Sequence, residues 1–101
     1  MDGTEITCVT IVTEYILESR LVRDLAACGA TGWTITEASG QGPRGRRVSE
    51  VEGGNIRVET LVSPDVASRI WDKLAAEYFP SYAVAAWSTK VLVARPERYG
   101  L

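Results

Sequence analysis

The sequence contains no histidine. This absence excludes Ser-His-Asp and Cys-His nucleophile activation, proton shuttling by imidazole and most catalytic zinc sites. Cysteine is scarce, and Cys8 and Cys28 are too far apart in the sequence for a CxxC redox motif and too few for a zinc cage. We interpret both as small, buried, reduced side chains, and we expect neither catalytic residues nor a metal site.

Long apolar runs are also missing. No stretch approaches the roughly 18 apolar residues of a membrane span, and no basic N-terminal segment precedes an apolar one. The net charge of −2 and the pI near 5.1 argue against nucleic acid or an anionic membrane as partner, so any anion site must be local. With 101 residues, 46% of them apolar and 24% charged, we expect a soluble, cytoplasmic protein of one domain, residues 1–101, with no membrane insertion.

Hydrophobic patterning predicts two helices and four strands. Leu17, Leu21 and Leu25 recur at helical spacing before Gly29, a residue type that commonly ends helices. Ser63-Pro64-Asp65 supplies an N-cap, a first-turn proline and an acidic residue for a second helix. The predicted strands cover residues 5–13, 31–39, 55–62 and 83–94, and the predicted helices cover residues 16–28 and 65–78.

The resulting order, β-α-β-β-α-β, predicts an α+β ferredoxin-like sandwich, in which a four-stranded antiparallel sheet carries two helices on one face. An unrelated α+β arrangement is the alternative. Several strands are apolar on both faces, the strand at residues 5–13 above all. Because a monomer rarely exposes a large apolar patch, we expect the second sheet face to meet another subunit.

The connection at residues 40–54 is far longer than a hairpin needs. It holds five of the nine glycines together with Arg44, Arg46 and Arg47. Glycines let backbone N–H groups turn toward an oxyanion, and arginines add bidentate contacts to phosphate or carboxylate. The connection is therefore a candidate phosphate cradle, although it matches neither a Walker A loop nor a Rossmann fingerprint, and a solvated loop tip is the alternative.

Two segments around this connection resemble PII signalling proteins. Residues 31–37 (TGWTITE), followed by Gly40-Gln41-Gly42, resemble the T-G-x-T-V-T-E-x-x-G-x-G segment that leads into the T-loop of that family. Residues 55–59 (NIRVE) resemble the strand that leaves the loop. The resemblance implies a homotrimer of ferredoxin-like subunits that binds adenine nucleotides in clefts between subunits, with a T-loop at about 40–54 and a tail at about 95–101.

The turn at residues 78–83 (YFPSYA) is similar to the Tyr-Phe-x-x-Tyr-Ala turn of the carboxysome-associated, SbtB-like branch of PII-like proteins. That branch implies AMP, ADP, ATP or cyclic AMP as ligand, in some members with bicarbonate. It also implies signalling through the T-loop to a membrane bicarbonate transporter or to the carbon-concentrating machinery. The chain lacks the Gly-Asp-Gly-Lys turn and the loop tyrosine of PII proper, and Asn55 replaces the usual lysine, which argues against 2-oxoglutarate sensing and uridylylation.

The resemblance assigns nucleotide contacts to residues at the base of the T-loop and beside it, around the start of the last strand and in the tail. These are Trp33, Thr34, Gly40, Gln41, Gly42, Pro43, Glu59, Leu61, Tyr82, Ala83, Val84 and Arg95. Trp33 and Thr34 would approach from a neighbouring subunit, and Arg44, Arg46 and Arg47 would bind phosphate or bicarbonate. As alternatives, Trp33 and Tyr82 would be core or interface packing, and Glu59 would form a cross-strand ion pair with Arg57.

These observations favour a non-catalytic regulator with no cofactor, whose ligands are adenine nucleotides. Three other functions are possible on the same fold. One is a small trimeric, CutA-like metal-tolerance protein, and another is a slow nucleotide phosphohydrolase that uses the loop arginines. The third is an interaction module that binds no nucleotide.

Overall fold

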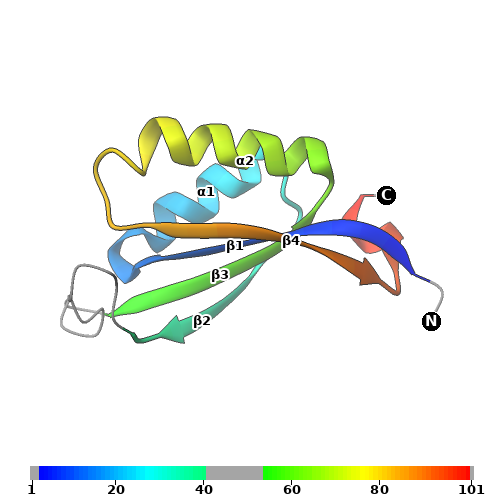
Figure 1. The fold of residues 1–101 in the computed structure, drawn as a ribbon, viewed down its shortest axis with the longest axis horizontal. Coiled ribbons are helices and arrows are strands. Elements are labelled where there is room, and N and C mark those ends of the chain that lie inside the picture. Colours follow the sequence, from blue (N-terminus) through cyan, green and yellow to red (C-terminus); the bar gives the residue numbers. More distant parts are fainter. Residues whose placement is uncertain (1–2, 41–53, 101) are drawn as a thin grey trace.

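The computed structural model describes residues 3–40 and 54–100. Its two α-helices lie side by side on one face of a twisted sheet (Figure 1). In chain order the elements are β1 (Thr4–Glu14), η1 (Tyr15–Leu17), α1 (Glu18–Cys28), β2 (Thr34–Ala38), β3 (Asn55–Val62), α2 (Pro64–Glu77), β4 (Ala85–Val93) and η3 (Pro96–Tyr99).

The four strands form one antiparallel sheet in the order β2-β3-β1-β4. Thr10 lies opposite Glu59 of β3 on one side and opposite Trp87 of β4 on the other, and Glu59 in turn lies opposite Thr34 of β2. This is the topology of a ferredoxin-like βαββαβ sandwich, so the predicted fold is confirmed.

The hydrophobic core fills the space between the sheet and the helices. Alternate residues of the central strands point into it, among them Val9, Ile11 and Val58, each at most 1% exposed. The helices contribute residues at the spacing of three and four that the sequence shows. These buried helix residues are Leu17, Leu21, Leu25, Cys28, Ala67, Ile70 and Leu74.

Helix ends carry local features that fix their positions. Gly29 ends α1 at a φ of 110°, and a β-carbon there would lie 3.2 Å from a methyl group of Val66. Arg69 donates from Nε to the carbonyl of Cys28 at 2.8 Å, which satisfies a terminal carbonyl of α1. Ser63 caps α2, because its hydroxyl accepts the N–H of Val66 at 3.3 Å.

Element boundaries differ from the predictions by up to three residues. The first helix opens with a 3-10 turn, η1, and becomes α-helical at Glu18. β2 begins at Thr34 instead of residue 31, because the chain before it is held by the hydroxyl of Thr60, which donates to the carbonyl of Gly32 at 2.6 Å. Cys8 and Cys28 are free and buried, as predicted.

The face of the sheet away from the helices, here called the open face, is mixed in character. It carries Cys8, Thr10, Leu61 and Trp87 beside the charged pair Arg57 and Glu59. The expectation of strands that are apolar on both faces is therefore too simple.

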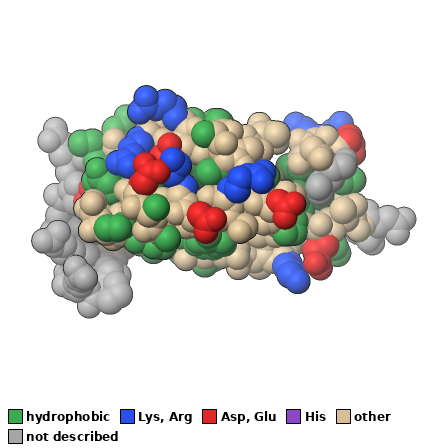
Figure 2. Space-filling view, turned by 90° about the horizontal axis from the view of Figure 1, so that it is seen from above, with side chains coloured by type: hydrophobic (Ala, Val, Ile, Leu, Met, Phe, Trp, Pro, Cys, Tyr) green, Lys and Arg blue, Asp and Glu red, His purple; other side chains and the backbone are tan. Residues whose placement is uncertain are grey.

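Charged side chains also gather over the two helices (Figure 2). Within the described ranges, neither helix has the length and hydropathy needed to span a bilayer.

Candidate functional site

One end of the sheet, here called the loop end, brings together the base of the T-loop and the turn before β4. Asn55 lies opposite both Ala38 of β2 and Glu14 of β1, and Ala85 lies opposite Val12. The Tyr15 N–H donates to the carbonyl of Gly54 at 3.0 Å. The fold therefore places the predicted residues Gly40, Tyr82, Ala83 and Val84 at one end of the molecule.

The turn at residues 78–84, here called the tyrosine turn, is held by hydrogen bonds along its length. Phe79 donates to the carbonyl of Leu74 at 2.9 Å, and Tyr82 donates to that of Tyr78 at 2.9 Å. Thr13 donates from its hydroxyl to the carbonyl of Ala83 at 3.3 Å. Val84 packs against the core. These contacts give the turn a defined shape.

On the open face, Glu59 accepts hydrogen bonds from two neighbours. Arg57 donates from Nε at 3.0 Å, and the thiol of Cys8 lies 3.6 Å from the other carboxylate oxygen. The ion pair proposed for Glu59 is therefore present, but it lies along β3 and not across strands as expected. The Arg57 guanidinium also stacks 5.6 Å from the centre of the Trp87 ring. Burial raises the pKa of Cys8, and the nearby Glu59 carboxylate raises it further.

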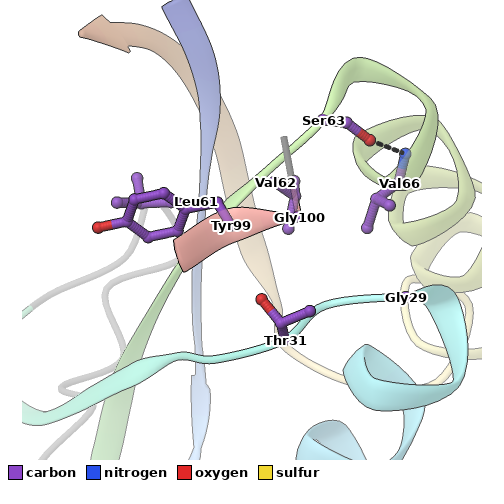
Figure 3. Close-up of a pocket in the computed structure, with 8 residues that line it drawn as sticks. All are labelled: Gly29, Thr31, Leu61, Val62, Ser63, Val66, Tyr99 and Gly100. Atoms are coloured by element: carbon purple, nitrogen blue, oxygen red, sulfur yellow. Dashed lines mark hydrogen bonds between the residues drawn. The ribbon is translucent and has the colours of Figure 1, made fainter. Parts of the chain in front are cut away.

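The opposite end of the sheet, here called the tail end, contains a pocket of about 140 Å³ (Figure 3). Leu61 and Tyr99 contribute apolar surface, and the capped start of α2 forms another wall. The lining residues are Gly29, Thr31, Leu61, Val62, Ser63, Val66, Tyr99 and Gly100. Arg95 belongs to the same tail, where it is exposed and lies 3.7 Å from a carboxylate oxygen of Glu97. The predicted residues Leu61 and Arg95 therefore lie at this end.

The predicted nucleotide residues thus fall into two groups within one chain. Ala85 and Val93, the first and last residues of β4, are eight residues apart, which is roughly 27 Å along a strand. Tyr82, Ala83 and Val84 precede β4, whereas Arg95 follows it. One subunit alone therefore cannot bring the tyrosine turn and the tail arginine to the same small ligand.

Two other predicted residues, Trp33 and Thr34, lie where β2 begins. Thr34 lies on the edge strand β2 opposite Glu59, about midway between the loop end and the tail end of the sheet. Trp33 is partly buried against the core, in the position that the packing alternative describes. Gln41, Gly42, Pro43, Arg44, Arg46 and Arg47 lie outside the described residues, and their predicted contacts stay predictions.

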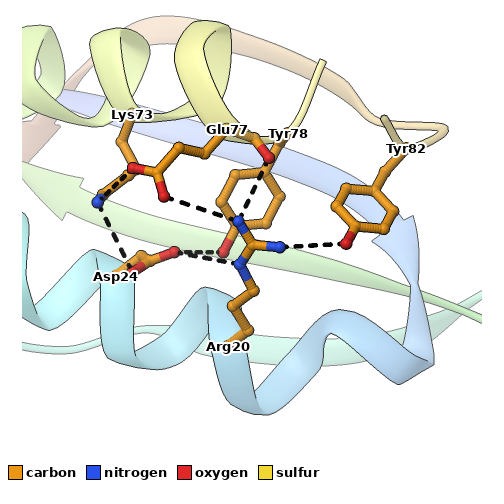
Figure 4. A network of polar contacts seen from close by, with 6 residues as sticks. All are labelled: Arg20, Asp24, Lys73, Glu77, Tyr78 and Tyr82. Atoms are coloured by element: carbon orange, nitrogen blue, oxygen red, sulfur yellow. Dashed lines mark hydrogen bonds and ion pairs between the residues drawn. The ribbon is translucent and has the colours of Figure 1, made fainter. Parts of the chain in front are cut away.

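The structure reveals a polar network that we did not predict from the sequence (Figure 4). Tyr78 is fully buried and donates its hydroxyl to Asp24 at 2.6 Å. The guanidinium of Arg20 lies against the rings of both Tyr78 and Tyr82, 4.7 and 5.5 Å from their centres. Lys73 joins the network through Glu77 at 2.6 Å. The sequence signal is weak, because charged pairs at i,i+4 usually indicate only a solvated helix face.

Asn55 is a second residue that the sequence did not single out as a ligand site. It is 8% exposed, and its Oδ1 atom has no hydrogen-bond partner among the described residues. Buried acceptors without a partner are uncommon in native proteins.

In the part of the chain that the structure describes, no group of three histidine, cysteine, aspartate or glutamate residues is placed to hold a metal ion.

The βαββαβ sandwich and the long β2–β3 connection define the class of this chain, a small ferredoxin-like α+β protein with a long loop between its second and third strands. Comparison with known proteins identifies the family. The sequence matches the family "Nitrogen regulatory protein P-II" over residues 6–98, so the chain belongs to the P-II family.

Several solved structures resemble this chain. A protein of Thermus thermophilus described as a PII-like signalling protein is 48% identical, with a TM-score of 0.84 over 98% of this chain and 99% of the other. CPII of Thiomonas intermedia, solved with ADP, AMP and bicarbonate, has a TM-score of 0.87 at 16% identity, over 97% and 96% of the two chains. The GlnK-ATP complex of Bacillus subtilis has a TM-score of 0.63 at 17% identity, over 90% and 85%.

Proposed function

We propose that the chain forms a homotrimer that binds adenine nucleotides in clefts between its subunits and acts in the cytoplasm as a regulator. The observation that carries this proposal is the division of the predicted site between two ends of the sheet, roughly 27 Å apart. In a cyclic trimer, the loop end of one subunit meets a different region of its neighbour. A cleft formed in this way would join the tyrosine turn of one subunit to the pocket and Arg95 of the next.

The pocket at the tail end supports this assignment. Pockets that take a whole drug-sized ligand usually measure about 300–1,000 Å³, whereas this one measures about 140 Å³. It therefore suits part of a nucleotide, and its apolar side chains Leu61 and Tyr99 favour the adenine ring over the phosphates. The exposed guanidinium of Arg95 lies on the same tail, where it would face the phosphates.

Bicarbonate is proposed as a second ligand, and a bicarbonate transporter or the carbon-concentrating machinery as the target, in a protein of the SbtB-like branch. The YFPSYA turn and the arginine-bearing T-loop support this branch. CPII, which shares the fold, was solved with ADP, AMP and bicarbonate, which makes this anion the first to test. Uptake of labelled bicarbonate should change in cells that lack the chain, and unchanged uptake would contradict a transporter target.

Isothermal titration with AMP, ADP, ATP and cyclic AMP, each with and without bicarbonate at constant pH, tests the proposal. We expect binding of at least one adenylate, and we expect Tyr99→Asp, which lies on η3 and outside the open face, to abolish it by placing a carboxylate in the pocket. Leu92→Asp is the matched control, because Leu92 is 56% exposed and lies outside the pocket. No binding heat with any adenylate would contradict the proposal.

A regulatory role also predicts that the bound nucleotide is not hydrolysed. We expect ATP to be recovered unchanged after prolonged incubation with the protein, as measured by chromatography. Protein-dependent ADP formation, lost in Arg46→Ala with Arg47→Ala, would instead favour the phosphohydrolase.

A further inference from the structure

Arg20 on α1 makes contacts with three different parts of the chain. Its Nη1 atom donates to the hydroxyl of Tyr82 at 3.2 Å, and its Nη2 atom donates to the carbonyl of Glu77 at 3.3 Å. Its Nε atom lies 3.9 Å from the Asp24 carboxylate. Figure 4 shows the guanidinium reaching across from α1 to the end of α2 and to the tyrosine turn.

Two of these contacts fix the two edges of the turn. The Glu77 carbonyl is one of the last four carbonyls of α2, which have no partner within the helix, so Arg20 caps the helix where the turn begins. The Tyr82 contact holds the turn at its other edge, immediately before Ala83. Between the two edges, the guanidinium lies 4.7 and 5.5 Å from the ring centres of Tyr78 and Tyr82, which are neighbours 6.2 Å apart.

The planar shape of the guanidinium makes this arrangement specific to arginine. An arginine presents separate donors in a fixed fork and stacks on aromatic rings, whereas a lysine ammonium is a single point charge on a flexible stem. A lysine at this position would keep the charge beside Asp24 and Glu77 but could not hold the turn at both edges.

From this geometry we infer that Arg20 is a positioning residue for ligand binding: it holds the tyrosine turn in the conformation that presents Ala83 and Val84 to the nucleotide. The inference rests on the proposed function, because it concerns the same cleft. Arg20 would touch no ligand itself. It acts by ordering the turn before the ligand arrives, so that binding does not have to order it.

Two measurements on three single variants test this role. Arg20→Lys keeps the charge, and Tyr82→Phe keeps the ring but removes the hydroxyl. Lys73→Ala is the matched control, because Lys73 belongs to the same network through Asp24 and Glu77. The measurements are adenylate affinity by titration and hydrogen exchange of the Tyr82, Ala83 and Val84 amides in ligand-free protein.

We expect Arg20→Lys and Tyr82→Phe each to weaken adenylate binding about five- to tenfold, as the loss of one hydrogen bond to a charged group does. Amide exchange at residues 82–84 should accelerate by a similar factor, while Lys73→Ala changes neither measurement. The double variant should bind about as weakly as the weaker single variant, because both changes break the same contact.

The outcomes separate this inference from the proposed function. A wild-type protein that binds no adenylate contradicts the proposed function. Suppose instead that the wild-type protein binds an adenylate. If Arg20→Lys then binds it equally well, or if the amides of residues 82–84 exchange no faster in Arg20→Lys than in Lys73→Ala, only the role of Arg20 is overturned. Equal weakening by Lys73→Ala would also overturn it, because the effect would then belong to the network as a whole.

Discussion

Tyr78 combines complete burial with a hydrogen bond to a carboxylate, which makes it sensitive to alkaline pH. Burial raises the pKa of its phenol well above the ordinary value, and the Asp24 carboxylate raises it further. Above about pH 10 the unfolded chain releases this proton while the folded chain keeps it. The folded state then binds more protons, so stability is complete below about pH 10 and falls as the pH rises above it.

Tyr78→Phe should therefore have different effects in two pH ranges. At pH 7 the variant leaves Asp24 without its donor, and we expect the free energy of unfolding to fall by about 1–2 kcal/mol. Between about pH 10 and 11 the gap from wild type should narrow, because phenylalanine has no proton to lose. Urea denaturation at a series of pH values measures both effects.

Tyr15→Phe is the control for this experiment, since Tyr15 is 53% exposed. Burial also raises the pKa of Cys8 and Cys28, but these thiols are present in every protein compared and do not contribute to the difference. A gap between Tyr78→Phe and wild type that stays constant from about pH 8 to 11 would contradict the argument.

At the scale of elements, the start of α2 depends on Ser63. Its hydroxyl accepts the Val66 N–H, which otherwise lacks a partner in the helix. We expect Ser63→Ala to lower the free energy of unfolding by about 1 kcal/mol and Ser63→Asp to leave it nearly unchanged. Thermal denaturation of the three proteins checks this, and equal loss in both variants would show that the cap is not the cause.

The T-loop arginines carry a second prediction at this scale. We expect Arg46→Ala with Arg47→Ala to weaken nucleotide binding about tenfold or more while the trimer stays intact, because these arginines are predicted to contact phosphate. Titration and light scattering measure the two properties. Arg23→Ala, which removes an arginine from α1, is the comparison. Unchanged affinity in the double variant would place the phosphate contacts elsewhere.

Patterns in the sequence predict the elements of this fold well, because each helix and strand follows from local periodicity. The helical spacing of Leu21 and Leu25 and the Ser63-Pro64-Asp65 start of α2 are both found as predicted. Local patterns do not predict where residues distant in the sequence meet. The contacts of Arg20 with the Tyr78 and Tyr82 rings, and the pocket that Tyr99 shares with Leu61, depend on how the elements pack.

For the whole molecule, the open face of the sheet is the surface that an assembly would cover. Trp87 is 42% exposed there and lies across β1 from Glu59. We expect Trp87→Glu to convert the trimer to monomers without unfolding the chain, since it adds a second carboxylate to the face. Analytical ultracentrifugation and circular dichroism measure the two effects.

Ile16→Glu provides the control for assembly, because Ile16 is 76% exposed on η1 and lies outside the sheet. This variant should remain trimeric. A wild-type chain that sediments as a monomer, or a Trp87→Glu variant that stays trimeric, would contradict the assignment of the open face to the subunit contact.

The separation of the two sheet ends has a genetic consequence. Tyr99→Asp changes only the tail end, and Arg46→Ala with Arg47→Ala changes only the T-loop. In a mixed cyclic trimer of these two proteins, one cleft pairs an undamaged loop end with an undamaged tail end. Two inactive alleles should therefore complement each other, so that subunit exchange between the purified variants restores nucleotide binding to one cleft of each mixed trimer.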